Sequence, residues 1–275
     1  MFIEIEMHVL QKCPDCKSAQ AENTHRLEIG ASGSAQADIH RLQIGASGEY
    51  APIANRRERR YTEDGSHTFY LPDLQESYHS IHGAVQESQH VYINAALMEA
   101  LPLFPEIRLL EVGFGTGLNA LLTLLANNTQ KTIYYHAIEA FPMTTSEWQN
   151  LNYPEILQTD NNLFQALHTA PWNTEYEKIT ATFYLKKLAT TLQSAVLPKN
   201  YFNVVYFDAF APSVQPELWT NEIFEKIYAS MTANGIITTY SAKGSVRRAW
   251  QQTGFTVERL PAPAGKREML RGVKV

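Results

Sequence analysis

The stretch of sequence that decides the fold is Glu111-Val112-Gly113-Phe114-Gly115-Thr116-Gly117. The apolar residues 107–112 predict a buried strand before the glycines, and residues 118–126 predict a helix after them. Glycines at a turn from strand to helix allow a ligand to approach the backbone closely. The spacing is GxGxG, and Leu118 stands where the dinucleotide fingerprint GxGxxG has its third glycine. The loop therefore predicts a nucleotide-like ligand other than NAD.

A carboxylate follows this loop at the distance expected of a ribose-binding acid. Glu139 comes at the end of a second predicted strand, residues 132–138, and 22 residues after Gly117. A carboxylate at that place accepts hydrogen bonds from both ribose hydroxyls of a bound nucleotide. The alternative is a solvated acid at a strand end. Together with the GxGxG spacing, Glu139 predicts S-adenosylmethionine as the cofactor.

Strands and helices alternate after residue 106, which predicts an α/β fold with a largely parallel, Rossmann-like sheet covered by helices on both faces. A closing antiparallel strand pair is more typical of a methyltransferase than of a dehydrogenase. The predicted strands are 107–112, 132–138, 181–185, 203–207, 236–240, 255–260 and 269–275, and the predicted helices are 118–126, 144–150, 162–168, 216–231 and 245–253.

The chain is predicted to have three parts. Residues 1–54 carry a near-duplicated polar segment without apolar periodicity, so we expect a poorly ordered extension there. Residues 55–105 are expected to form a small N-terminal lobe, with a hairpin at Asp64-Gly65 and a helix over 90–100. Residues 106–275 are expected to form the methyltransferase-like domain.

Composition bounds the class of protein. The 275 residues are 44% hydrophobic and 19% charged, which is typical of a globular protein with one substantial core. The sequence has no apolar run of the roughly 18 to 20 residues that would span a membrane and no leader-like start, so we expect a cytoplasmic protein without a membrane partner. Cys13 and Cys16 form one CxxC pair, too few ligands for a structural zinc site, and we expect no metal.

Charge is distributed unevenly along the chain. The net charge is −5, but residues 241–275 carry eight basic and two acidic residues, a local balance of +6 that leaves −11 for the rest. Such a segment can meet a polyanion, or it can simply solvate the surface of a terminal helix and strand pair. The eight basic residues are Lys243, Arg247, Arg248, Arg259, Lys266, Arg267, Arg271 and Lys274.

Asp208 is the candidate for the reacting centre. It ends the predicted central strand 203–207, at the carboxyl edge where open α/β sheets bind their ligands. The alternative is a helix cap or turn former, because Pro212 follows it. Phe210 and Trp219 lie nearby in sequence and could stack on a base, although aromatic residues at such spacing also belong to cores.

Several long motifs in order resemble one family, the methyltransferase domain of the bacterial tRNA wobble-uridine modification enzyme MnmC, whose stand-alone form is called MnmD. The resemblance covers about Arg56 to Val275. The motifs are EVGFGTGLN (111–119), DAFAPSVQPELWT (208–220), TYSAKGSVRRAWQQTGF (239–255), GKREML (265–270) and the segment from DGSHTFY to VYI (64–93).

The resemblance implies a class I methyltransferase sheet and methylation of the exocyclic amine of 5-aminomethyl-2-thiouridine in tRNA, giving 5-methylaminomethyl-2-thiouridine. It places Asp208 beside that amine, where we expect it to bind the amine and accept its proton. One position departs, because Lys186-Lys187 aligns with a Gly-Asp pair that contacts adenine in the family. The residues implied to bind the cofactor are Glu111, Gly113, Gly115, Thr116, Gly117, Asn119, Glu139 and Asp208.

The resemblance also leads to expectations about the substrate and partners. The chain stops at Val275, which implies a methyltransferase alone, with a separate flavin-dependent oxidoreductase acting upstream. The residues expected to close the substrate pocket are Tyr78, Glu87, Ser88, Phe210, Trp219 and Tyr240. The residues expected to hold tRNA phosphates are Lys243, Arg247, Arg248, Lys266 and Arg267.

Two other readings stay open. One is a small-molecule methyltransferase or aminopropyltransferase, because these enzymes use similar sheets and ribose-binding acids. The other is a non-catalytic RNA-binding module of the same fold. Cofactor binding separates the second reading from an enzyme, and the substrate separates the first from a tRNA methyltransferase.

Overall fold

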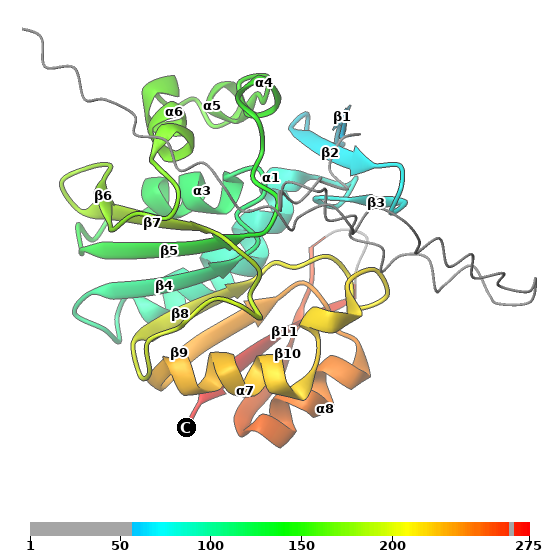
Figure 1. The fold of residues 1–275 in the computed structure, drawn as a ribbon, viewed down its shortest axis with the longest axis vertical. Helices are drawn as coiled ribbons and strands as arrows, with labels where there is room; N and C mark the ends of the chain where they lie inside the picture. Colours follow the sequence, from blue (N-terminus) through cyan, green and yellow to red (C-terminus); the bar gives the residue numbers. More distant parts are fainter. Residues whose placement is uncertain (1–56, 264–266) are drawn as a thin grey trace, which may run out of the picture. The chain divides into compact units, whose positions relative to one another are not determined.

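The structure is a computed structural model that describes residues 57–263 and 267–275. In this part of the chain, eight strands form one sheet in the order β10-β11-β9-β8-β4-β5-β7-β6 (Figure 1). The five strands β9, β8, β4, β5 and β7 are parallel, whereas β6, β11 and β10 run antiparallel to their neighbours. The bounds are β4 (Ile107–Val112), β5 (Ile133–Glu139), β6 (Glu177–Lys178), β7 (Phe183–Ala189), β8 (Phe202–Phe207), β9 (Met231–Thr239), β10 (Phe255–Pro261) and β11 (Glu268–Lys274). The predicted α/β fold and its closing antiparallel pair are confirmed.

The order of the strands reverses at the centre of the sheet. β5 pairs with one edge of β4, and β8 pairs with the other edge, with Val112 opposite Phe207. In open α/β sheets, ligands bind outside the carboxyl ends of the strands at such a reversal. Gly113 and Asp208, which follow these two strands, therefore lie side by side at the place where a ligand is expected, and the Asp208 N–H donates to the Val112 carbonyl at 3.0 Å.

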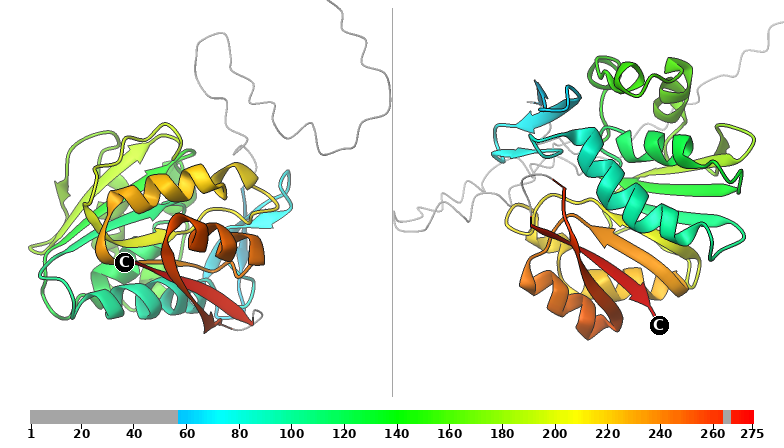
Figure 2. Two further views of the ribbon diagram at one scale, coloured as in Figure 1. Left: turned by 90° about the horizontal axis from the view of Figure 1, so that it is seen from below. Right: turned by 180° about the vertical axis from the view of Figure 1, so that it is seen from behind.

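Helices cover both faces of the sheet because alternate strand residues point to opposite sides. Leu109 packs in a buried cluster with residues of η3 and α3, whereas Leu110 packs in a second cluster with residues of α7 and α8. Figure 2 shows the teal and green helices on one face and the yellow and orange helices on the other. The bounds are η3 (Gln89–Leu97), α3 (Leu118–Ala126), α7 (Asn221–Ser230) and α8 (Gly244–Thr253), and three short helices, α4 (Thr145–Trp148), α5 (Tyr153–Ile156) and α6 (Asn161–Thr169), follow β5.

The segment before β4 contributes a small sheet and one long helical segment. β1 (Glu58–Tyr61), β2 (His67–Leu71) and β3 (Glu76–Ser77) form an antiparallel sheet. Gly65 has φ +81°, so the hairpin predicted at Asp64-Gly65 is confirmed. The helix predicted over 90–100 begins earlier, because α1 (Ala84–Ser88), η3 and α2 (Met98–Ala100) follow one another directly. Its central part, η3, is π-helical and packs on the main sheet. The domain limits expected near residues 54 and 105 stay predictions.

The prediction of one continuous helix over 216–231 is wrong. Residues Pro216–Leu218 form a 3-10 turn, η4, and α7 begins only at Asn221, because the Thr220 hydroxyl accepts the N–H of Ile223 and caps a new helix. Asn234-Gly235 is not the helix stop. Asn234 has φ +61° and lies inside β9, where the register against β8 shifts. Within residues 57–263 and 267–275, every helix is too short or too polar to cross a membrane.

Candidate active site

The glycine loop between β4 and α3 has a backbone that only glycine adopts without strain. Gly113, Gly115 and Gly117 have φ values of +91°, +49° and +72°. A Cβ atom on Gly113 would lie 2.7 Å from the backbone oxygen of Asp208, and one on Gly117 would lie 2.8 Å from Nε2 of His168. The loop is therefore pressed against the end of β8 on one side and against α6 on the other. A ligand above it can reach the backbone directly.

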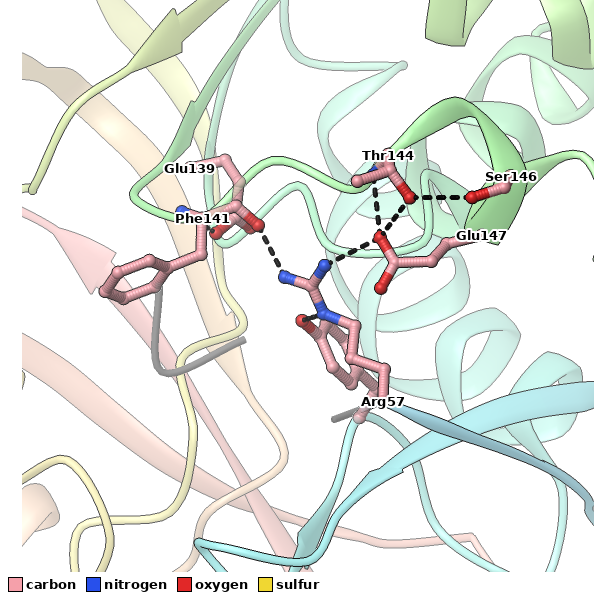
Figure 3. A network of polar contacts seen from close by, with 7 residues as sticks. Arg57, Glu139, Phe141, Thr144, Ser146 and Glu147 are labelled. Atoms are coloured by element: carbon pink, nitrogen blue, oxygen red, sulfur yellow. Dashed lines mark hydrogen bonds and ion pairs between the residues drawn. The ribbon is translucent and has the colours of Figure 1, made fainter. Parts of the chain in front are cut away.

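Glu139 lies across this loop at the end of β5. Its Oε2 accepts the N–H of Gly115 at 2.9 Å. Its Oε1 accepts the N–H of Phe141 at 2.8 Å, and Figure 3 shows these two residues. Two backbone donors hold the carboxylate in one orientation, and each oxygen keeps a further lone pair. The carboxylate can thus accept hydroxyl groups of a ribose seated over the loop, as predicted from the sequence.

Arg57 joins the small sheet to the loop that follows Glu139. Its Nε donates to the hydroxyl of Tyr78 at 2.9 Å, its Nη2 donates to the carbonyl of Phe141 at 2.7 Å, and its Nη1 donates to Oε2 of Glu147 at 2.9 Å (Figure 3). Burial, followed by the negative charge of Glu139, raises the pKa of Tyr78, so its hydroxyl stays protonated. Arg57 was missed from the sequence, although it belongs to the basic run RRERRY at 56–61.

Asp208 is held by side chains from two other segments. The hydroxyl of Tyr92 donates to Oδ1 at 2.5 Å, and Nδ2 of Asn119 donates to Oδ2 at 2.8 Å. Hydrogen bonds donated to a carboxylate favour its charged form over the acid. Asn119 was predicted as a cofactor residue and also contacts the candidate catalytic acid. Tyr92 was missed, and the only sequence signal for it is its place in the 64–93 motif.

Glu111 lies beneath this edge at the end of β4 and is completely buried. Burial, and secondly the negative charge of Asp208, raises the pKa of Glu111 well above its ordinary value. Ionisation of Glu111 is therefore disfavoured beside Asp208. Thr116 is also buried, and its backbone oxygen is 3.1 Å from Nε2 of His168. The cofactor roles of Glu111 and Thr116 stay predictions.

The aromatic residues expected around the substrate occupy different positions. The indole N–H of Trp219 donates to the carbonyl of Phe210 at 2.8 Å, and the hydroxyl of Tyr240 donates to the carbonyl of Ala209 at 2.9 Å. Both therefore fix the backbone directly after Asp208. The Phe210 ring meets the edge of the Tyr78 ring, with centroids 5.2 Å apart, next to the glycine loop.

Glu87 and Ser88 lie on α1 and are buried. Oε2 of Glu87 accepts the N–H of Ser80 at 2.8 Å. The charge of Glu87 reaches the Asp208 neighbourhood, because it contributes to raising the pKa of both Tyr92 and Tyr240. Whether Glu87 or Ser88 contacts the substrate stays a prediction.

Lys187, which aligns with the family's adenine-contacting pair, is buried in the structure. It is 1% exposed, and its Nζ donates to the carbonyls of Leu167 and His168 at 2.8 Å each, at the end of α6. Burial lowers the pKa of Lys187 to about 7. β7 also extends four residues beyond its predicted end, so Lys186-Lys187 lies inside the strand, and Ala189 is the residue that pairs with Glu139. The residue beside Glu139 at this edge of the sheet is therefore Ala189 and not a lysine.

The basic carboxyl-terminal residues fall into two groups. Arg259 pairs with Glu268, Arg271 pairs with Glu99 and Glu258, and Lys274 donates to backbone carbonyls, so these three are used within the fold. Lys243, Arg247 and Arg248 lie at the start of α8, where Lys243 and Arg248 are exposed and no acid of the described residues forms an ion pair with any of the three. Arg267 is exposed. Lys266, like Cys13 and Cys16, lies outside the described residues.

Comparison with known proteins agrees with this geometry. Residues 156–275 match a family described as S-adenosyl-L-methionine-dependent methyltransferase. Over 223 residues, the chain is 31% identical to the tRNA 5-methylaminomethyl-2-thiouridine biosynthesis bifunctional protein MnmC of Magnetococcus marinus, covering 75% of this chain and 32% of that protein. The crystal structure of MNMC2 from Aquifex aeolicus matches with a TM-score of 0.63 and 27% identity, covering 79% of this chain and 70% of that one. The chain is an S-adenosyl-L-methionine-dependent methyltransferase that is similar to the methyltransferase part of the MnmC proteins.

The resemblance inferred from the sequence motifs is thereby confirmed. The MnmC protein of Cupriavidus metallidurans is 28% identical over 218 residues, covering 74% of this chain and 32% of that protein. The chain spans about a third of the length of these curated relatives. Spermidine synthase from Thermotoga maritima, at 13% identity and a TM-score of 0.50, shares the fold alone.

S-adenosyl-L-methionine is the cofactor of this methyltransferase, and the residues at the edge of the sheet fit it. The glycines of the loop have positive φ angles and no side chains, so a ligand can approach the backbone closely. The Glu139 carboxylate is fixed beside the loop and can accept further hydrogen bonds. Asp208 lies against Gly113, so a group held by its carboxylate is adjacent to the loop.

Proposed function

We propose that the chain methylates the exocyclic amine of 5-aminomethyl-2-thiouridine in tRNA, giving 5-methylaminomethyl-2-thiouridine. The observation that carries this proposal is the contact of Gly113 with the backbone of Asp208. It brings together the start of the glycine loop and an acid that accepts hydrogen bonds from two side chains. The printed names of the MnmC relatives support the tRNA substrate. The protein would then act in the cytoplasm, downstream of a separate flavin-dependent oxidoreductase.

Alignment is the first task of the residues around the site. When bound, S-adenosyl-L-methionine supplies a methyl group from its sulfonium. The sulfur keeps the electron pair of the S–C bond, and the lone pair of the amine forms the new N–C bond. The residues Glu139 and Gly113 to Gly117 would fix the position of that methyl group. Asp208 would hold the amine nitrogen in line with it, at the near-attack distance of about 3 to 3.5 Å that makes the step effectively unimolecular.

Proton removal is the second task. Only a neutral amine has a lone pair for the new N–C bond, yet an ionised Asp208 favours the ammonium form. We propose that Asp208 accepts one amine proton before or during transfer and later releases it to solvent. General-base assistance of this kind contributes typically about 10²- to 10⁴-fold. The raised pKa of Glu111 keeps a second negative charge away from the amine, which limits the bias toward ammonium.

The substrate surface would combine an aromatic pocket with a basic rim. Phe210 and Tyr78, whose rings already meet beside the glycine loop, are the candidates for contacting the splayed-out base. The basic residues Lys243, Arg247, Arg248, Lys266 and Arg267 would hold phosphates, which position the RNA without reading its sequence.

Mass analysis of tRNA nucleosides tests the proposal. Purified protein and S-adenosyl-L-methionine are incubated with tRNA that carries the 5-aminomethyl nucleoside, and a gain of one methyl group on that nucleoside is expected. The matched control is the same tRNA without the 5-aminomethyl group. Methylation of a free amine but not of tRNA would point to a small-molecule methyltransferase, and cofactor binding without any methylation would point to a non-catalytic RNA-binding module.

A further inference from the structure

Tyr92 reaches the candidate catalytic acid from a part of the chain that lies far away in sequence. It belongs to the π-helical segment η3, and its side chain is 1% exposed. Its hydroxyl donates to Oδ1 of Asp208 at 2.5 Å across a separation of 116 residues. π-helical turns within helices are frequent at functional sites, where the extra residue changes the direction in which side chains point.

The surroundings of Tyr92 favour a hydroxyl that donates a hydrogen bond and keeps its proton. Burial is the largest cause of the raised pKa of Tyr92, and the negative charge of Asp208 is the second. The ring packs against that of Tyr206, with centroids 5.1 Å apart, and Tyr206 packs edge-on against Tyr135. These rings hold the Tyr92 ring in place, with its hydroxyl within hydrogen-bond distance of the Asp208 carboxylate.

We propose that Tyr92 is a positioning residue that fixes the orientation of the Asp208 carboxylate and keeps it ionised until the amine proton arrives. The proposal rests on the proposed function of Asp208. Asn119, in the first turn of α3, donates a hydrogen bond to the other oxygen of the carboxylate, Oδ2. A carboxylate held on both oxygens keeps one orientation, and we expect it to meet the amine in that orientation.

The titratable groups that act on this site come from every neighbouring element. Glu111 is on β4, Tyr135 on β5, Tyr240 directly after β9, and Glu87 on α1, and each is electrostatically coupled to Asp208 or Tyr92. All four groups are still present in Tyr92→Phe, which removes a single hydroxyl. A change in the titration of Asp208 in such a variant therefore reports the missing O–H.

The test is Tyr92→Phe in the full chain, with Tyr153→Phe as the matched control. Tyr153 is equally buried and its hydroxyl donates to the carbonyl of His67 at 2.8 Å, away from Asp208. For Tyr92→Phe we expect kcat to fall about 10- to 100-fold, the loss for one hydrogen bond to a charged group, with KM for S-adenosyl-L-methionine unchanged. The acid limb of the kcat–pH profile should move to higher pH, and Tyr153→Phe should leave that limb in place.

Two outcomes separate this inference from the proposed function. A carbon-13 NMR titration of the aspartate carboxyl signal that is absent in Asp208→Asn requires no substrate, and its midpoint should rise in Tyr92→Phe. An unchanged midpoint and pH profile would overturn the role of Tyr92 even if the wild-type protein methylates tRNA. Wild-type protein that fails to methylate tRNA, but shows the shifted midpoint in Tyr92→Phe, would refute the substrate and leave the positioning role supported.

Discussion

The two carboxylates at the edge of the sheet are held in opposite ways. Glu139 accepts two backbone N–H groups from its own and the preceding loop, whereas Asp208 accepts side-chain donors from η3 and α3. Backbone donors depend on the local path of the chain and are present in any sequence that folds this way. Side-chain donors must be placed one by one. The cofactor half of the site is therefore built into the βαβ unit, and the substrate half is assembled from distant segments.

Asp208→Asn should have the largest effect and should affect only the substrate half. An amide cannot take up the amine proton, so we expect turnover to fall about 10²- to 10⁴-fold. Calorimetric titration with S-adenosyl-L-methionine should still show binding, which separates loss of the base from loss of the cofactor site. Unchanged turnover with intact cofactor binding would show that Asp208 is not the base.

Gly113→Ala should affect both cofactor binding and turnover, because Gly113 is where the cofactor half and the substrate half of the site are in contact. A methyl group there meets the Asp208 carbonyl at 2.7 Å and has to adopt φ +91°. We expect a loss of roughly 1 to 3 kcal/mol in the free energy of unfolding, measured in urea, together with weaker cofactor binding and lower turnover. Gly65→Ala is the matched control, since it has φ +81° but no atom closer than 3.7 Å. Equal losses in both variants, with normal cofactor binding, would mean that the contact has no functional consequence.

Glu139→Gln should affect only the cofactor half. Each oxygen of Glu139 faces an N–H donor, so the NH₂ group of a glutamine must face one of them. We expect the Kd for S-adenosyl-L-methionine to rise about tenfold or more, the loss for a hydrogen bond to a charged group, while kcat at saturating cofactor changes little. A lower kcat with an unchanged Kd would reverse the assignment of the two carboxylates.

The predictability of the two halves differs for the same physical reason. The GxGxG spacing and Glu139 lie within one strand–helix–strand unit, so their proximity follows from the local pattern. The contacts of Asp208 join residues 116 and 89 positions apart, and only tertiary packing decides which side chains meet there. Sequence reasoning therefore found Asp208 but missed Tyr92.

The error at Lys186-Lys187 has a similar origin. Two adjacent lysines resemble the end of a strand, because a buried lysine is rare. Lys187 is nevertheless buried in the middle of β7, since the carbonyls at the end of α6 and the Trp172 ring, 4.5 Å from Nζ, surround its ammonium group. That environment exists only after α6 has docked, so no local pattern could indicate it.

Lys187→Met should change how the free energy of unfolding depends on pH, because Lys187 is buried beside the cofactor half of the site. The pKa of Lys187 is about 7 in the folded chain and about 10.4 in an unfolded one, so the unfolded chain holds more protons over this range. The free energy of unfolding should therefore rise with pH, by about 1 kcal/mol from this group between pH 7 and 8. Urea unfolding of wild type and variant should show this rise only in the wild type. Parallel pH dependences would mean that Lys187 titrates elsewhere.

Replacement of Arg247 and Arg248 by glutamine should have the smallest effect, and only on the RNA side. Each phosphate contact removed lowers the steepness of log K against log salt by about 0.7 to 0.9. Filter binding of tRNA across a salt series measures this slope. Arg259→Gln is the control, because Arg259 already pairs with Glu268 and should leave the slope unchanged. Equal slopes for the double variant and the wild type would exclude this surface.

Arg57 links three segments near the site, so we expect them to open together. One guanidinium uses all three of its nitrogens to hold Tyr78, Phe141 and Glu147, which belong to three separate segments. If the small sheet moves away and carries Arg57 with it, the contacts of Arg57 with Phe141 and Glu147 break together. Amide hydrogen exchange in β2 and at the start of α4 should therefore report one shared opening free energy, and the two segments should open as a single cooperative unit.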